Sequence, residues 1–270
     1  MKRTTSTSAT IGTTPIMIPA DDALEERIRR YWSARSEDFA RLREFELTTE
    51  HRERWLSEIR PWLARIPAHA RILDVGTGAG FFAVLLGSLE HEVTGVDLSA
   101  DMIESAKRLA ARHGVLADLR VMNAEELAFE DESFDLVISR NLTWTLPHPE
   151  NAYGEWSRVL ARGGVLLNFD ADYGNVSFTC LTESLREEGV GNAHERLGGM
   201  VLNECDAIKA SLAVSRVRRP LWDFSVLERL GFGEIAIDRL VSERIYLERD
   251  EVWNPVPLFR IAAVKTWGKI

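Results

Sequence analysis

A short apolar run that ends in a glycine-rich turn constrains the fold of this chain more than any other feature. Residues 71–75 read Arg-Ile-Leu-Asp-Val, and glycines follow at positions 76, 78 and 80. The run has the length of a buried strand, and glycines permit a tight turn and close approach of the backbone to a ligand. The helical run 81–89 comes next. The segment therefore predicts the strand, turn and helix with which an α/β domain begins.

Strands and helices are expected to alternate from this point onward. We expect further strands at 92–96, 119–122, 134–139 and 165–169. Helices are expected at 101–113, with Ser99 as N-cap, and at 150–160, stopped by Gly163-Gly164. This alternation is typical of a parallel sheet with right-handed crossovers.

The flanking regions follow other patterns. Helical spacing is evident over 22–66, whereas 171–222 breaks the alternation with helical patterns at 182–188 and 202–213. A helix at 223–230 and strands at 234–240 and 258–264 follow, and the stretch 241–257 is expected to extend the first of these strands before looping. The predicted parts are a flexible arm (1–20), an N-terminal helical cap (21–66), a Rossmann-like core (67–170), a helical substrate lid (171–222) and a C-terminal completion of the sheet (223–270).

Composition excludes several classes. The net charge is −9, and the densest basic stretch is 216–219, which either serves a substrate anion or lies in a solvated loop or helix end. We expect no nucleic-acid partner. Neither cysteine lies in a Cys-x-x-Cys pair, so no metal is expected. Apolar runs fall short of a membrane span, and the N-terminus lacks the apolar region of a secretory signal. We expect a cytoplasmic monomer or homodimer without membrane contact.

Asp74 indicates the kind of cofactor that the turn binds. The third glycine comes one residue too early for Gly-x-Gly-x-x-Gly, and a carboxylate at position 74 would repel the pyrophosphate of a dinucleotide. It suits a cofactor that carries an ammonium and a sulfonium, such as S-adenosylmethionine (SAM). The same reasoning disfavours an NAD-dependent oxidoreductase.

Polar residues at the ends of the next strands extend this site. Asp97 can accept hydrogen bonds from both ribose hydroxyls, or it is a helix N-terminal charge. Met102 either covers the adenine or belongs to the core, and Arg140 reaches the cofactor, a substrate anion or a surface acid. The residues expected at the cofactor from their own positions are Asp74, Gly76, Thr77, Gly78, Asp97, Leu98, Met102, Asn123, Ala124, Glu125 and Arg140.

Together these segments resemble the class I SAM-dependent methyltransferases, particularly the ubiquinone/menaquinone-biosynthesis-like, small-molecule branch. Residues 71–80 look like motif I, 93–99 with Met102 like motif II, and 156–164 like the helix, turn and fifth-strand signature. The resemblance covers roughly 68–170 and implies a seven-stranded, mostly parallel sheet with an antiparallel last strand. It departs at Asn123, where Asp is common, and at Ala161-Arg162, where Lys-Pro is common. It also implies an N-terminal aromatic over the cofactor, for which Tyr31 and Trp32 are candidates; the alternative is helix packing.

Methyl transfer requires chiefly that donor and acceptor be aligned and water excluded, so no motif marks a catalytic residue. The candidate bases are His148, Asp172 and Tyr173, with His194 weaker. For His148 the alternative is a capping or surface role. Trp32, Trp144 and Trp222 are the candidate substrate-binding residues, and Trp253 and Tyr173 would add to an aromatic pocket; each can also be core.

The leading hypothesis is a SAM-dependent methyltransferase (EC 2.1.1) that modifies an N, O or C atom of a small molecule, such as a secondary metabolite, and yields S-adenosylhomocysteine. A methyltransferase acting on protein or RNA is the alternative among enzymes; the missing basic patch argues against it. A SAM-binding protein with other chemistry is the alternative outside this class.

Overall fold

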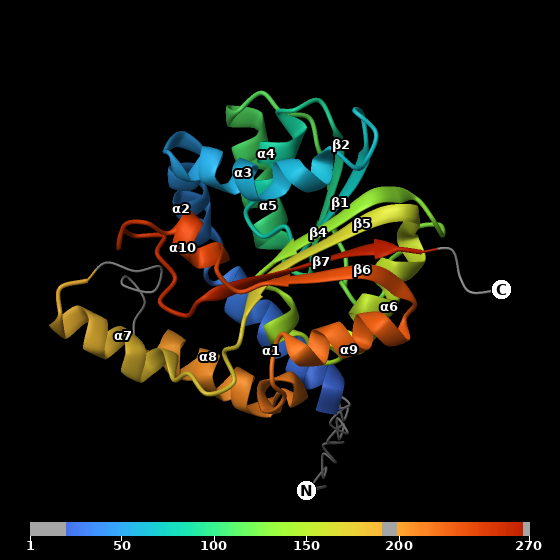
Figure 1. Ribbon diagram of the computed structural model, residues 1–270. Coiled ribbons are helices and arrows are strands. Elements are labelled where there is room, and N and C mark those ends of the chain that lie inside the picture. Colours follow the sequence, from blue (N-terminus) through green and yellow to red (C-terminus); the bar gives the residue numbers. More distant parts are fainter. Residues whose placement is uncertain (1–19, 191–198, 267–270) are drawn as a thin grey trace, which may run out of the picture.

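The computed structural model describes residues 20–190 and 199–266 (Figure 1). Residues 1–19 of the arm expected at 1–20 and the candidate base His194 lie outside this part of the chain, and the last residue of that arm begins α1. The helices with at least five residues are α1 (Ala20–Ser33), α2 (Ser36–Thr48), α3 (His51–Leu63), α4 (Phe81–Gly87), α5 (Ala100–Arg112), α6 (Pro149–Val159), α7 (Phe178–Glu187), α8 (Gly199–Ser211), α9 (Leu221–Arg229) and α10 (Val241–Ile245). Short 3-10 turns are η1 (Thr143–Thr145) and η2 (Ala213–Arg216).

Seven strands form one sheet in the order β3-β2-β1-β4-β5-β7-β6. The strands are β1 (Arg71–Val75), β2 (Glu92–Asp97), β3 (Asp118–Val121), β4 (Phe134–Arg140), β5 (Leu160–Ala171), β6 (Phe232–Asp238) and β7 (Leu258–Lys265). The neighbours from β3 to β5 pair in parallel, whereas β7 lies antiparallel between β5 and β6. The predicted Rossmann-like sheet with an antiparallel last strand is confirmed.

The two faces of the sheet build separate cores. Along β1, Ile72 belongs to one buried cluster, while Leu73 and Val75 belong to the other, because successive side chains of a strand point to opposite faces. The first cluster takes in α3 and α4, including Trp55. The second takes in α6 and α9, including Trp156. Helices on both faces explain why the central strands are apolar throughout.

The connections differ from the sequence prediction at two places. Strand β5 begins at Leu160 rather than at 165 and carries an irregularity in its pairing with β4 near its start. The stretch after β6 turns into helix α10 instead of extending the strand. Val241 and Ile245 are fully buried one helical turn apart, so tertiary burial decides this short helix.

The N-terminal and inserted helices gather at one edge of the sheet. Because β7 is antiparallel to β5, it begins at the end of the sheet where β4 and β5 finish. Figure 1 shows α7 and α8 at this end. Helix α8 packs against both α1 and η1. Within the described residues, no helix is both long and apolar enough to cross a membrane. The carboxyl ends of the parallel strands are thus covered by helices from distant parts of the sequence.

Candidate active site

A large cavity opens at the carboxyl ends of the parallel strands. It contains roughly 1440 Å³ of space not filled by atoms, its open mouth included. One side, here called the turn side, is lined by Asp74, Gly76, Thr77, Gly78, Asp97, Leu98, Met102, Met122, Asn123 and Ala124. The other, here called the arginine side, is lined by Trp32, Arg35, Phe39, Arg43, Arg140, Trp144, Tyr173, Phe178, Tyr246 and Asn254.

The glycine turn has backbone conformations that residues with a side chain adopt only at a cost in free energy. Gly76, Gly78 and Gly80 all have positive φ values, 67°, 53° and 92°. A Cβ at Gly80 would also come within 2.9 Å of the Ala106 Cβ, so this glycine lets α4 pack against α5. A Cβ at Gly78 would meet nothing within 4 Å. Gly78 thus leaves open space beside the turn, as close approach of a ligand requires.

Asp74 lies buried beneath the turn. Its carboxylate accepts hydrogen bonds from the Thr77 hydroxyl at 2.6 Å and from the Ala83 amide at 3.2 Å. Burial raises the pKa of Asp74 to about 7, although these two hydrogen bonds oppose the shift. A nearby cation would favour the ionised form. The carboxylate is therefore suited to a positively charged ligand.

Asp97 joins the end of β2 to the same turn. It accepts a hydrogen bond from the Gly78 amide and another from the Ser99 amide, both at 2.9 Å. Burial raises its pKa to about 6, and the two amides work against that rise. Ser99 caps α5 as predicted, since its hydroxyl accepts from the Met102 amide. This cap fixes the first turn of α5, from which Met102 lines the cavity.

The end of β3 contributes Asn123 and Ala124 to the cavity wall but not Glu125. The Asn123 amide group donates to Glu25 of α1 at 2.7 Å, while its oxygen accepts from the Glu125 amide. The Glu125 carboxylate instead accepts from the His148 amide at 2.7 Å. Sequence reasoning missed Glu25, because it lies 98 positions from Asn123 and belongs to no recognisable motif.

Arg140 extends from the end of β4 into the cavity wall. Its guanidinium donates to buried Glu46 of α2 at 2.8 and 3.1 Å and to the Tyr246 hydroxyl at 2.9 Å. The same group lies over the Trp55 ring, 4.2 Å from its centre. The surface-acid alternative for Arg140 is therefore wrong, because Glu46 is fully buried. Glu46 and Tyr246 were not found by sequence reasoning.

Aromatic side chains form much of the arginine side. The Trp144 ring centre lies 4.9 Å from that of Tyr173, 5.6 Å from Phe178 and 6.1 Å from Trp32. Burial raises the pKa of Tyr173 well above its ordinary value, and its hydroxyl is bonded to Asn141 and Asn254. A phenol held in this way stays protonated at neutral pH and is poorly suited to act as a base.

Five expected site residues lie outside the cavity lining: Tyr31, Glu125, His148, Asp172 and Trp222. The Tyr31 hydroxyl accepts from Arg35 at 2.9 Å, so Trp32 faces the cavity in its place. His148 is exposed at the start of α6, where its backbone is used. Trp222 packs on Tyr153 beneath the sheet. A helix presents adjacent residues on different faces, and sequence spacing alone did not give the correct face.

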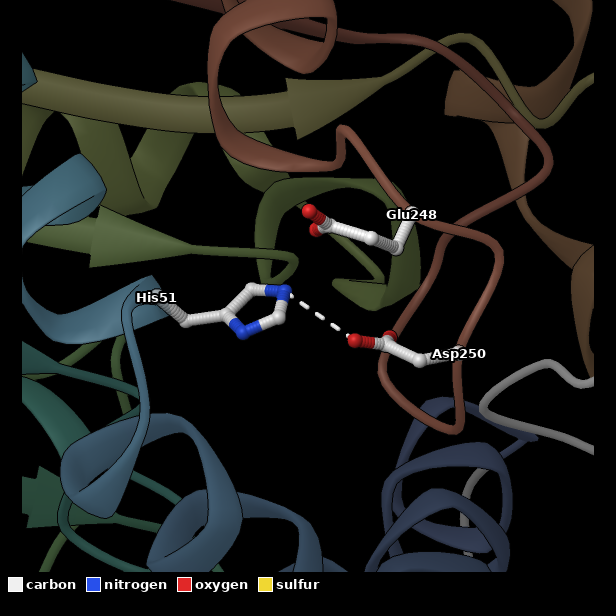
Figure 2. Close-up of side chains that lie close together, drawn as sticks. All are labelled: His51, Glu248 and Asp250. Atoms are coloured by element: carbon white, nitrogen blue, oxygen red, sulfur yellow. Dashed lines mark ion pairs between the residues drawn. The ribbon is translucent and has the colours of Figure 1, made fainter.

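A second polar cluster lies away from the glycine turn. His51 of α3 faces Asp250 at 3.4 Å, with Glu248 beside them (Figure 2). Donor atoms of the three residues lie within 4.8 Å of one another. Glu248 is already engaged by both terminal nitrogens of Arg54. The cluster thus ties the segment after α10 to α3, and the His51 ring centre also lies 6.4 Å from that of Tyr246.

Comparison with known proteins places this architecture in a family. A family model described as a methyltransferase domain matches residues 73–168. The ubiquinone/menaquinone biosynthesis C-methyltransferase UbiE of Bartonella henselae is 30% identical over 196 residues, which cover 70% of this chain and 74% of that protein. A phosphatidylethanolamine N-methyltransferase of Cereibacter sphaeroides is 38% identical over 96 residues; that match covers 35% of this chain and 47% of the relative.

Solved structures agree with the fold. Geranyl diphosphate C-methyltransferase from Streptomyces coelicolor A3(2), solved with Mg²⁺, geranyl diphosphate and S-adenosylhomocysteine, aligns with a TM-score of 0.61. The alignment covers 92% of this chain and all of that chain at 15% identity, which shows the fold alone. Taken with the extent of the match to UbiE, these findings show that the chain belongs to the class I SAM-dependent methyltransferases of the ubiquinone-biosynthesis-like branch and is an enzyme with SAM as its cofactor.

Proposed function

We propose that this methyltransferase transfers the methyl group of SAM to an N, O or C atom of a small molecule that binds on the arginine side of the cavity. The observation that carries the proposal is the continuity of the cavity: one space is lined by the glycine turn and also by Trp32, Trp144 and Tyr173. Relatives named for ubiquinone biosynthesis and for phosphatidylethanolamine support a small acceptor over a protein or RNA.

The turn side fits the cofactor in its donors, charge and space. Asp97 would accept the ribose hydroxyls, because its carboxylate already faces the cavity from the end of β2. Met102 and Ala124 would contact the adenine, and Asn123 would bind it after exchanging its bond to Glu25. Asp74 would act on the cationic methionine end through the turn. Bound SAM supplies a methyl group already activated by its sulfonium.

The protein's own part is alignment and exclusion of water. Among the described residues that line the cavity there is no histidine, and burial raises the pKa of Tyr173, whose hydroxyl donates to Asn141 and accepts from Asn254. A low-dielectric aromatic wall strengthens the electrostatic interactions at the reacting atoms. The chain would therefore work mainly by holding the acceptor in line with the methyl group.

Methyl-labelled SAM tests the proposal directly. Wild-type protein and Asp97→Ala are incubated with labelled SAM and a cell extract, which is then separated into small-molecule, protein and RNA fractions. We expect label in the small-molecule fraction for wild type and little for the variant. Label confined to protein or RNA would overturn the small-acceptor proposal.

A further inference from the structure

Three arginines, two of them from α2 and its N-cap, line the arginine side. Arg35 precedes α2, Arg43 lies in its middle, and Arg140 ends β4. Arg35 is 2% exposed and Arg43 is 9% exposed. Arginine is rarely buried without a partner, because removing a charge from water costs several kcal/mol unless another group compensates. Three such side chains at one cavity require an explanation.

One buried carboxylate faces this group of arginines. Glu46 is 0% exposed and pairs with Arg43 at 2.6 Å and with Arg140 at 2.8 Å. The carboxylates on the turn side are engaged elsewhere: Asp74 binds Thr77 and Ala83, and Asp97 binds two backbone amides. Glu25, the remaining acid in the lining, binds Asn123. The arginine side therefore carries more positive charge than its own acids balance.

Guanidinium nitrogens on this side lack partners within the described residues. They are Nε and Nη2 of Arg35 and Nε of Arg43 and Arg140. Burial lowers the pKa of Arg43 to about 10, with Glu46 acting against the shift and Arg140 and Arg35 adding to it. Buried donors without acceptors are rare in native proteins, and a ligand is one accepted reason for them. The three side chains that carry these nitrogens line the cavity.

The aromatic rings around the arginines indicate the chemistry of the rest of the ligand. The Phe39 ring centre lies 4.5 Å from the Arg35 guanidinium carbon and 5.2 Å from that of Arg43. Trp32 packs against Phe39 and also against Trp144. An apolar slot with cationic groups at its wall suits a molecule with a ring or hydrocarbon body and an anionic oxygen group.

We propose that Arg35 and Arg43 bind an anionic oxygen group of the methyl acceptor, such as the carboxylate of an aromatic acid. Guanidinium groups present fork-like donors that match carboxylates, which suits them to this role. Arg140 is already bonded to Glu46 and Tyr246, and through Glu46 it helps to position Arg43. The inference rests on the proposed small-molecule function and names the acceptor class for the same cavity.

Binding to the protein saturated with S-adenosylhomocysteine tests the inference. Benzoate, phenylacetate and indole-3-acetate are titrated calorimetrically, each against its neutral amide. We expect at least one acid to bind ten or more times more tightly than its amide. Arg35→Met and Arg43→Met should each lose at least tenfold in affinity for that acid. Arg60→Met is the matched control, because Arg60 lies on α3 with its side chain 57% exposed. Arg35→Lys should retain part of the effect.

The carboxylate of the cofactor is the competing source of the same chemistry. Affinities for S-adenosylhomocysteine and for 5′-methylthioadenosine, which lacks the amino-acid end, separate the two. If the acceptor proposal holds, Arg35→Met changes neither affinity by more than about twofold, which also shows that the variant is folded. Loss of S-adenosylhomocysteine binding with unchanged 5′-methylthioadenosine binding would assign the arginines to the cofactor and overturn the proposal.

Two further results separate this inference from the function on which it rests. Equal binding of acids and amides, or no binding of either, would overturn the anion site while small-molecule methylation in the labelled extract stood. Label found only in protein or RNA would remove the proposed function itself, and the acceptor inference would fall with it.

Discussion

The two sides of the cavity are built in different ways. The turn side takes its residues from the stretch Asp74 to Ala124. Asp74 and Asp97 bind groups within this stretch, whereas Asn123 reaches Glu25 of α1. The arginine side collects Arg35, Arg43, Arg140 and Tyr246 from parts of the chain far apart in sequence. The turn side is therefore largely local and predictable from a motif, whereas the arginine side depends on tertiary packing.

The largest effect is expected from the buried carboxylate of the arginine side. Burial acts to raise the pKa of Glu46, but Arg140 and Arg43 outweigh it and hold that pKa below its ordinary value. Glu46→Gln leaves both arginines without their counter-charge, and we expect the free energy of unfolding to fall by about 3–5 kcal/mol.

Urea unfolding measures this change, with Glu50→Gln as the control. Glu50 is 86% exposed in its ion pair with Arg54, so its loss should cost less than about 1 kcal/mol. A similar small loss for Glu46→Gln would show that the arginine side does not depend on this carboxylate.

The next effect concerns the turn side. Asp97→Ala removes the carboxylate that we propose accepts the ribose hydroxyls, together with its hydrogen bonds from the Gly78 and Ser99 amides. We expect affinity for SAM and S-adenosylhomocysteine to drop about a hundredfold, as for the loss of charge-assisted hydrogen bonds. Isothermal titration calorimetry measures it, and Asp101→Ala on the exposed start of α5 is the control. Near-native affinity in Asp97→Ala would remove the ribose assignment.

A glycine pair distinguishes turn geometry from helix propensity. Gly80→Ala places a side chain at φ 92° and within 2.9 Å of the Ala106 Cβ, so we expect a loss of about 2 kcal/mol in unfolding free energy. Gly154→Ala, inside α6 with nothing within 4 Å of the added Cβ, should instead stabilise by up to about 1 kcal/mol. Chemical denaturation compares the two. Equal stability of the two variants would contradict the packing role of Gly80.

The smallest effect is a pH dependence of cofactor binding. The pKa of Asp74 is about 7 in the free protein, and a bound cation favours its ionised form. Protonation as the pH falls from 8 to 6 should therefore weaken SAM binding by about tenfold. The measurement is the affinity ratio of wild type to Asp74→Asn across this range, which cancels titration of the cofactor's amino group. A ratio independent of pH would exclude Asp74 as the group responsible.

The sequence brought the residues of the turn side together for a physical reason. Strand ends of a parallel sheet lie at one edge, so a carboxylate at the end of one strand and a turn at the end of the next are neighbours by topology. Asp74, Asp97 and Met102 line the cavity as their positions implied. His148 and Trp222 do not, because a loop or helix residue can point to either side of its element.

By itself, the sequence determined the order of most strands and helices, the glycine turn and the negatively charged side chain beside that turn. These features depend on local backbone freedom, period-2 and helical patterns, and one carboxylate beside the turn. Only the tertiary structure decided that Trp32 rather than Tyr31 lines the cavity, that Arg35 and Arg43 lie beside Arg140, and that Glu46 joins them. Those choices depend on how α1 and α2 pack over the strand ends, a long-range arrangement that no local pattern encodes.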